Sequence, residues 1–441
     1  MKDGFLERFS VFAQKIGAQI HLRSLRDSFA TIMPLYILAG LATLLNNVFF
    51  TPDGFLASIF LASTIEKWRL WGNLITNGTL NISAVLVAVA LAYHLSSNRR
   101  VKNLIAPIIV AVSCLIVLLP ALDSVVVPGT KETLMVSNVI LFSKIGTMGM
   151  FAGIFVGLFA TELFLKLSKN KRLQINIGQG VPPAVGQSFN IMIPAFIVIG
   201  LFSFMSFILQ AFLDTNCITL ISTLIQEPLK TINTSLPGYI LIYSFGNFFF
   251  TMGIHQAVIN GPLLDPILLS NISENMIAYS QGAPIPNIIN YSFQSVYGLT
   301  GGTGNTIGLL IAIFLFSKYK VYRDIGKLAL APGLFNINEP VIFGIPIVFN
   351  ISLIIPFVLS PAICLIIAYF ATAWGFISPC VVLIPWTTPP ILSAFLATGG
   401  DWRAVVLQIL LISGTALFYL PFLKMSERIV KAEMEGKELG K

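Results

Sequence analysis

The feature that most constrains this chain is the recurrence, along nearly its whole length, of apolar stretches long enough to cross a lipid bilayer. The hydrocarbon core of a bilayer is about 30 Å thick, which an α-helix of about 20 residues spans. Only 10% of the 441 residues are charged, whereas a typical soluble domain carries about 25%. The sequence therefore predicts an all-α, polytopic membrane protein.

The apolar stretches divide the chain into two halves. In the first half we expect spans at about residues 29–50, 74–95, 104–122, 139–165 and 189–213. In the second half the apolar stretches are residues 237–250, 307–316, 341–376, 380–396 and 405–423. Together they predict about ten transmembrane helices, accompanied by re-entrant hairpins and amphipathic surface helices.

These spans define four predicted segments. Residues 1–27 have apolar positions at helical spacing and are expected to form an amphipathic helix on the cytoplasmic face. Residues 28–213 form an N-terminal transmembrane half, and residues 214–423 form a C-terminal half with re-entrant hairpins. Residues 424–441 are rich in Lys, Arg and Glu and form a cytoplasmic tail.

Basic residues cluster in the loops between alternate spans, chiefly at residues 99–102, 166–172 and 318–327. Because cytoplasmic loops carry the excess of Lys and Arg, we expect these loops and both termini to be cytoplasmic. This orientation explains the net charge of +8. The basic residues form no continuous face in the sequence pattern, so no nucleic-acid partner is expected.

Three apolar stretches of the second half are broken by Gly, Pro and Asn, at residues 297–305, 332–340 and 385–390. Unpaired backbone amides cannot face lipid, so these segments are expected to be buried in protein or to line a wet cavity. Such breaks are typical of a transport site. Residues 301–305 resemble a phosphate-binding loop only superficially, because no Lys follows them. The four cysteines lack metal-ligand spacing, so neither a cofactor nor a metal is expected.

Glu339 is the strongest candidate binding residue, because no other charged residue occurs between Lys327 and Asp401. The following Pro340 favours a helix start, which places the carboxylate where the helix dipole and free amides stabilise an anion. A buried carboxylate in this position can accept two hydrogen bonds from sugar hydroxyls. The alternative is a helix cap that binds only its own amides.

His255 is the only ionisable residue between Lys230 and Asp265. Its imidazole can both donate and accept a hydrogen bond, and it changes charge near neutral pH. We expect it to bind a hydroxyl or to carry a proton. The alternative is an interior histidine bonded to a neighbouring carbonyl.

Three further residues flank these two. The ring of Trp386 can stack on the apolar face of a pyranose, although a tryptophan at the lipid headgroups is an equally good explanation. Asn336 and Asn338 lie in the same turn as Glu339 and can supply amide hydrogen bonds to a substrate. Turn formation explains these asparagines just as well.

Gly149, Gly153 and Gly157 share one helix face at four-residue spacing. Small residues at this spacing let two helices approach closely. Packing within one subunit is favoured over a dimer seam.

The segments Gly-Ile-His at residues 253–255, Asn-Glu-Pro-Val-Ile-Phe-Gly-Ile-Pro at residues 338–346 and Pro-Trp-Thr at residues 385–387 resemble the enzyme IIC permeases of bacterial phosphotransferase systems. The resemblance is to the lactose/cellobiose/diacetylchitobiose family. The block at residues 338–346 is a long, specific match, and the order of the apolar spans is similar over nearly the whole chain.

This resemblance implies a homodimer in the bacterial plasma membrane, with the dimer contact in the first half and one β-linked disaccharide bound in the second. It implies that Glu339 and His255 are the sugar-binding acid and histidine, and that the segment of Trp386 supplies an aromatic contact. The implied partners are a IIB protein, whose phosphocysteine donates the phosphoryl group, and the IIA protein that charges it. The chain is then the membrane subunit of a sugar phosphotransferase complex and not an enzyme on its own. Glu339 or His255 is expected to accept the proton of the sugar 6-hydroxyl.

Two other functions fit part of the pattern. A proton-coupled secondary sugar transporter would use Glu339 and His255 to exchange protons with the medium while the substrate crosses unmodified. A structural scaffold or channel leaves unexplained why ionisable residues coincide with helix breaks. Uptake that needs phosphorylated partners and yields sugar phosphate distinguishes the phosphotransferase function from uptake driven by a pH gradient.

Overall fold

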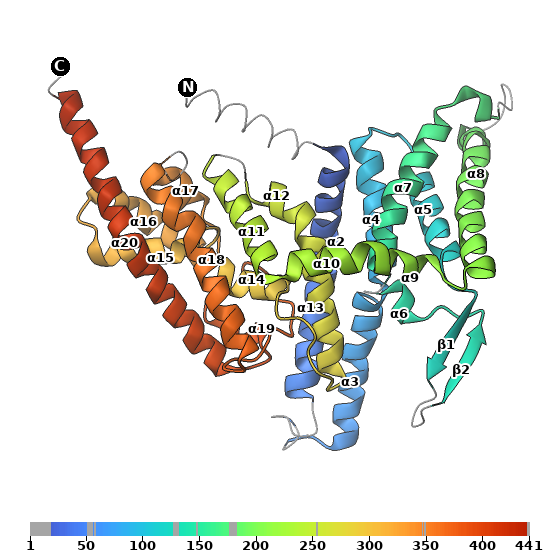
Figure 1. Ribbon diagram of the computed structural model, residues 1–441, viewed down its shortest axis with the longest axis horizontal. Coiled ribbons are helices and arrows are strands. Elements are labelled where there is room, and N and C mark those ends of the chain that lie inside the picture. The colour runs from blue at the N-terminus through green and yellow to red at the C-terminus, as the bar shows by residue number, and fades with distance from the viewer. Residues whose placement is uncertain are drawn as a thin grey trace. The chain divides into compact units, whose positions relative to one another are not determined.

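The computed structural model describes residues 19–50, 56, 59–126, 132–146, 149–175, 183–252, 255–345, 347 and 350–438. In this part of the chain the secondary structure is helical apart from one β-hairpin (Figure 1). The residues group into two compact units. We call the described residues of Gln19–Tyr36 and Leu74–Lys230 the N-terminal unit, and those of Ile37–Asn73 and Thr231–Lys441 the C-terminal unit.

Several helices of the described residues are long and apolar enough to cross a bilayer. They are Ile20–Asn47, Ala62–Asn98, Met150–Ser168, Phe189–Phe212, Ser352–Ala373 and Trp402–Val430, with shorter apolar helices at Ile105–Val117, Leu236–Phe250 and Thr306–Phe316. The polytopic all-α fold is therefore confirmed, and the number of crossings stays a prediction.

The helix boundaries differ from the predicted spans in several places. The predicted span 380–396 is non-helical as far as residue 391, and only the short helix α19 (Leu392–Ala397) lies at its end. Helix α2 (Ile20–Leu44) includes residues 20–27, which the sequence assigned to a separate surface helix; residues 1–18 of that helix lie outside the described residues. The predicted span 104–122 is too long, because α5 (Ile105–Val117) ends shortly before Pro120 and Leu122 begins a strand. Helix α20 (Trp402–Glu438) continues without a break through the predicted boundary at 423/424.

The division between the units also differs in position from the predicted boundary at 213/214. It falls between Lys230 and Thr231, and residues 37–73 group with the C-terminal unit. The division into a dimer-forming half and a sugar-binding half stays a prediction.

The N-terminal unit consists of helices and the hairpin. Besides the first part of α2 and the end of α3 (Ala62–Asn77), it contains η3 (Leu80–Ile82), α4 (Ser83–Asn98), α5, β1 (Leu122–Val126), β2 (Thr133–Ser137), α6 (Phe142–Ile145), α7 (Met150–Ser168), η4 (Lys171–Leu173), α8 (Pro183–Phe212), α9 (Cys217–Ile221), η5 (Ser222–Gln226) and the start of α10 (Glu227–Thr234). The two strands are antiparallel, with Leu122 opposite Ser137. The sequence did not predict this hairpin.

The glycine stripe of α7 packs against α4 of the same unit. A Cβ added at Gly153 would overlap the carbonyl of Ala84, and one added at Gly157 would lie 2.9 Å from the Cβ of Leu91. The predicted close helix packing within one subunit is confirmed at these two glycines.

The C-terminal unit contains the broken segments. Its elements are the second part of α2, η1 (Leu45–Phe49), α3 (Ala62–Asn77), α11 (Leu236–Phe250), α12 (Ala257–Leu263), α13 (Asp265–Ser280), α14 (Tyr291–Gly298), α15 (Thr306–Phe316), α16 (Lys320–Leu334), α17 (Glu339–Gly344), α18 (Ile351–Ala373), α19 (Leu392–Ala397) and α20. Non-helical stretches at residues 281–290, 299–305 and 374–391 lie between these helices. Asparagine caps begin two of the helices: Asn290 accepts the N–H of Phe293 at α14, and Asn350 accepts that of Ser352 at α18.

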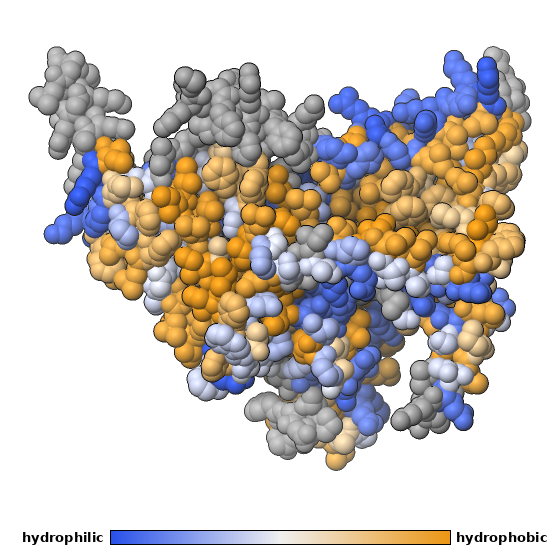
Figure 2. Space-filling view, viewed as in Figure 1, coloured by the Kyte–Doolittle hydropathy of each residue, from blue (hydrophilic) through white to orange (hydrophobic). Residues whose placement is uncertain are grey.

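One apolar cluster holds α11, α15, α17, α18 and α20 together. Its buried members include Phe250, Leu310, Ile342, Phe357 and Tyr419. The outer faces of α18 and α20 are hydrophobic as well (Figure 2) and carry the exposed side chains Leu359, Ile363, Leu410 and Leu417. Exposed apolar side chains on long helices are suited to lipid rather than to water.

Candidate functional site

Asn336 joins the three broken segments of the C-terminal unit. Its φ of 63° is left-handed, a conformation that Asn tolerates better than most residues. Its Oδ1 accepts the N–H of Gly301 at 2.7 Å. Its Nδ2 donates to the carbonyls of Trp386 at 2.6 Å and Thr388 at 3.0 Å. A single buried side chain thus connects the glycine-rich loop, the Glu339 turn and the Trp386 loop.

Asn338 makes a second connection between the glycine-rich loop and the Glu339 turn. Its Nδ2 donates to the carbonyl of Thr303 at 2.7 Å and to Oγ1 of Thr306 at 3.1 Å. Gly302 has a φ of 96° and packs so closely that an added Cβ would overlap the Asn338 side chain. The loop therefore needs glycine at this position for both conformation and space.

The glycine-rich loop is also tied to two long helices. The carbonyl of Gly304 accepts hydrogen bonds from Ser360 Oγ of α18 at 3.0 Å and from Tyr419 Oη of α20 at 2.7 Å. Asn305 spans the loop itself, since its Oδ1 accepts the N–H of Thr300 and its Nδ2 donates to the carbonyl of Tyr297. The irregular backbone is thus buried in protein and hydrogen-bonded, as the sequence predicted for a broken segment.

Glu339 is the first residue of α17 and directly follows its N-cap, Asn338. The neighbouring side chains of Asn338 and Val341 are buried, whereas the side chain of Glu339 is exposed. The expectation of a buried carboxylate is therefore wrong for the chain alone. The reason is geometric: Asn336 and Asn338 point inward to their loop partners, and the residue after them points out. Among the described residues, none forms a hydrogen bond or ion pair with this carboxylate.

His255 lies just before α12, and its side chain is also exposed. Its Nδ1 accepts the backbone N–H of Ala257 at 3.2 Å. The neutral ring therefore carries its hydrogen on Nε2, which makes Nε2 the donor. The ring packs on Phe250, with ring centroids 4.7 Å apart.

His255 and Glu339 border the same apolar cluster. Phe250, which contacts the histidine ring, belongs to the cluster together with Val341 and Ile342 of α17. Phe250 also lies 6.1 Å from the ring of Phe357, edge to face. The two candidate residues are thus anchored to one core, and their direct meeting on a sugar stays a prediction.

Trp386 has a fixed backbone and a ring that is 41% exposed. Asn336 holds its carbonyl, and a turn bond from the N–H of Thr388 to the carbonyl of Pro385 closes the loop around it. A little earlier in the same loop, the Leu383 carbonyl lies so close to Gly40 of α2 that an added Cβ would overlap it. The loop therefore presents an indole from a rigid support.

Sequence reasoning missed a group of polar residues that tie the loop at 374–391 to α13, α14 and α20. Asn275 and Asn290 both donate to the carbonyl of Cys380, at 2.9 and 3.2 Å. Ser292 donates to the carbonyl of Val382. Gln408 of α20 accepts the N–H of Ile391 at the end of the loop and donates to the carbonyl of Val296 in α14. The available signal was the presence of amide side chains in otherwise apolar helices.

No metal centre is found in the described part of the chain, where no group of three or more His, Cys, Asp and Glu side chains could hold an ion. The four cysteines are buried and free.

Comparison with known proteins places this arrangement in a family. Residues 26–361 match the family described as "Phosphotransferase system, EIIC". The "Lichenan permease IIC component" of Bacillus subtilis (strain 168) is 31% identical over 435 residues, covering 98% of this chain and 95% of the relative. The "PTS system cellobiose-specific EIIC component" of Lactococcus lactis subsp. lactis (strain IL1403) is 31% identical over 490 residues, covering 98% and 99%.

A solved structure agrees with these relatives. It is the crystal structure of the transporter ChbC, the IIC component from the N,N'-diacetylchitobiose-specific phosphotransferase system. The TM-score is 0.90 and the sequence identity 32%, with 98% of this chain and 99% of the other covered. The resemblance predicted from residues 338–346 is thereby confirmed. The chain belongs to the family of phosphotransferase system EIIC permeases, the membrane subunits of sugar phosphotransferase systems in the bacterial plasma membrane.

Proposed function

We propose that this permease binds a β-linked disaccharide of the cellobiose, diacetylchitobiose or lactose type beside Glu339, His255 and Trp386. The specificities named for the relatives, which include cellobiose and N,N'-diacetylchitobiose, support this substrate class. The observation that carries the proposal is the side chain of Asn336, which joins the Glu339 turn to the Trp386 loop.

The three side chains offer complementary chemistry to a sugar. The Glu339 carboxylate accepts hydrogen bonds from hydroxyls, and Nε2 of His255 donates one. The exposed indole of Trp386 stacks on the apolar face of a pyranose ring. Glu339, His255 and Trp386, which supply the acceptor, the donor and the stacking surface, all belong to the C-terminal unit.

Asn336 and Asn338 act, in this proposal, chiefly by positioning. Each amide nitrogen already donates two hydrogen bonds within the protein. They therefore support the sugar through the orientation of Glu339 and Trp386 more than through their own donors.

Phosphorylation accompanies transport in this proposal. The sugar 6-hydroxyl oxygen attacks the phosphorus of a IIB phosphocysteine, the S–P bond breaks, and the cysteine leaves as a thiolate. Glu339 accepts the hydroxyl proton, whereas His255, whose Nδ1 is occupied by the Ala257 N–H and whose Nε2 carries the hydrogen, positions the sugar as a hydrogen-bond donor. The IIA protein then phosphorylates IIB again. In this proposal residues 28–213 also provide the contact between the two subunits of a homodimer. Both termini of the chain lie on the cytoplasmic side. The basic clusters at residues 99–102, 166–172 and 318–327, the last of which lies mostly in the first half of α16, support this orientation.

The test is equilibrium binding of a panel of β-disaccharides to the purified chain and to Glu339→Gln. We expect Glu339→Gln to abolish both binding and phosphorylation by charged IIB, because the amide replaces one acceptor oxygen with a donor. The matched control is Glu66→Gln, the same change at an exposed glutamate of α3. Normal phosphorylation by the Glu339 variant would remove the role proposed for this carboxylate. Uptake that follows a pH gradient without IIB would favour proton-coupled transport, which the family membership disfavours.

A further inference from the structure

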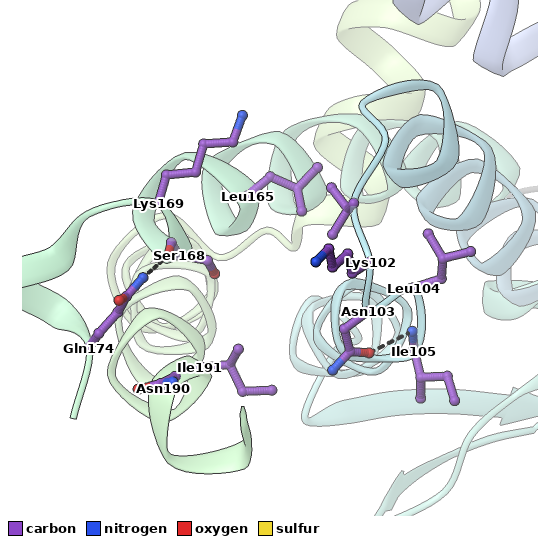
Figure 3. Close-up of a pocket in the computed structure, with 11 residues that line it drawn as sticks. Lys102, Asn103, Leu104, Ile105, Leu165, Ser168, Lys169, Gln174, Asn190 and Ile191 are labelled. Carbon is purple, nitrogen blue, oxygen red and sulfur yellow. Dashed lines mark hydrogen bonds between the residues drawn. The ribbon is translucent and has the colours of Figure 1, made fainter. Parts of the chain in front are cut away.

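The N-terminal unit contains a cavity of about 970 Å³ that the proposed function does not use. It lies where the start of α5, the end of α7 and the described start of α8 come together (Figure 3). This volume is within the range of cavities that bind small molecules. All residues that line it belong to one unit.

Part of the lining of the cavity is basic and polar. Lys102 and Lys169 line it together with Gln174 and Asn190, and none of the described residues of the lining is acidic. The nearest carboxylate along α7, that of Glu162, is paired with Arg99 and lies 3.7 Å from His21. The positive charge of the two lysines is therefore not neutralised at the cavity itself, which favours an anionic ligand.

A buried hydroxyl in the cavity wall adds a second, independent indication. Within the described part of the chain, Oγ of Ser168 is shielded from solvent and has no hydrogen-bond partner. The carbonyl of the same residue accepts a 2.8 Å bond from Nε2 of Gln174, which fixes this part of the wall. Buried polar groups are nearly always paired, so a lone hydroxyl beside two lysines calls for a ligand with acceptor oxygens.

Apolar side chains also line the cavity, and Figure 3 shows them among the polar ones. Leu165, Ile191 and Ile105 line it, and Leu165 is buried. The cavity also lies at the end of the apolar helix Met150–Ser168, directly before the basic residues that follow it. This combination matches a molecule with a charged head and a hydrocarbon tail at the boundary between lipid and water.

We propose that this cavity binds the phosphate group of an anionic phospholipid, with Lys102 and Lys169 as charge partners and the start of an acyl chain on Leu165 and Ile191. Ser168 Oγ donates a hydrogen bond to a phosphate oxygen. The site is independent of the disaccharide site, since it rests on different residues and a different unit.

The test is native mass spectrometry of the purified full-length chain with phosphatidylglycerol or phosphatidylcholine of identical acyl chains. We expect the wild type to bind phosphatidylglycerol more tightly. The double variant Lys102→Gln, Lys169→Gln should lose about 25-fold in that affinity, since each basic residue contributes about fivefold near a membrane surface, and should bind phosphatidylcholine as before.

The matched control is Lys171→Gln, Arg172→Gln. It removes two exposed charges from η4, which directly follows α7 but does not line the cavity. An equal loss of affinity in this control would mean general surface electrostatics and would overturn the site. Equal competition by inorganic phosphate at the same concentration would show an anion site that does not require a lipid, and would overturn the lipid assignment.

A labelling experiment covers the case in which the lysine variants fail to fold. Ile105, 67% exposed and part of the lining, is replaced by Cys, while the native cysteines are buried. Phosphatidylglycerol should slow maleimide labelling of Ile105→Cys at least about threefold relative to phosphatidylcholine. Equal labelling rates in the two lipids would contradict the proposal. A further outcome is that the lysine variants keep their lipid selectivity and lose binding of IIB. That result would overturn the lipid site and mean that the two lysines bind the partner protein.

Discussion

The side-chain amide of Asn336 donates a 2.6 Å hydrogen bond to the backbone carbonyl of Trp386, fifty positions further along the chain. The same side chain holds Gly301 and Thr388. Three loops that are separated in sequence are therefore fixed by one residue, which lies three positions before Glu339.

The first prediction concerns this residue. Asn336→Gly keeps the left-handed backbone accessible but removes three hydrogen bonds. Because buried partners are left unpaired, we expect the free energy of unfolding to fall by about 2 kcal/mol and sugar affinity to fall at least about tenfold. Thermal unfolding in detergent and equilibrium binding measure the two effects.

Asn138→Gly is the control for backbone conformation. Asn138 has a φ of 56° and is exposed, so the same change removes a comparable side chain without breaking a loop junction. A binding loss of similar size in both variants would contradict the role of Asn336.

A second prediction follows from the hydrogen-bonded state of His255. Since Nδ1 accepts the N–H of Ala257, the donor toward a sugar is Nε2. Gln can place an amide N–H near the position of Nε2, whereas Asn is too short. We expect His255→Gln to keep measurable binding and His255→Asn to lose at least about tenfold in affinity. The reverse order in a binding assay would mean that Nδ1 faces the sugar.

A third prediction concerns the support of the Trp386 loop. Gly40→Ala should push the Leu383 carbonyl away from α2 and so displace the loop, with a cost of about 1 to 3 kcal/mol and weaker sugar binding. Gly414→Ala on α20 is the matched control, because nothing lies within 4 Å of a Cβ added there. If both variants bind sugar equally well, the loop does not depend on this contact.

A fourth prediction concerns pH. Burial alone would raise the pKa of the Asp401 carboxyl, but hydrogen bonds from Arg403 and from Ser378 outweigh it and lower this pKa from 3.8 to about 2. The ionised group therefore stabilises the folded chain above pH 4, and this contribution is lost as the pH falls toward 2. The Tm of Asp401→Asn should lie below that of the wild type at neutral pH, and the difference should shrink between pH 4 and pH 2.

A constant difference in Tm across that range would contradict the low pKa. Asp324→Asn serves as the comparison, since Asp324 is exposed and pairs with Lys327, one helical turn away, at 3.3 Å. Exposed ion pairs of this kind contribute at most about 1 kcal/mol.

Much of the fold was predictable because lipid imposes a simple requirement on length and polarity. The apolar stretches at residues 189–213 and 405–423 correspond to α8 and α20. Each predicted broken segment contains irregular backbone, at residues 299–305, 335–338 and 385–390, whereas residues 332–334 still belong to α16. The hairpin at residues 122–137 was not predicted. Its first strand continues an apolar stretch whose pattern is equally compatible with a helix.

The candidate site was predictable in its members but not in their relations. The isolation of Glu339 and His255 is visible in the sequence, whereas the partners of Asn338 lie 32 and 35 positions away and only folding brings them together. The outward direction of the Glu339 side chain was likewise not predictable, because it depends on the hydrogen bonds by which Asn336 and Asn338 point inward to other loops.

The loop junction at Asn336 has a consequence for how such permeases diversify. A substitution that reshapes the Trp386 loop to admit a different sugar also disturbs the donor that holds the turn before Glu339, so the effects of changes in the two segments will not add. New sugar preferences in this protein are therefore expected to arise through paired substitutions in the two segments, with single changes in either one passing through a poorly binding intermediate.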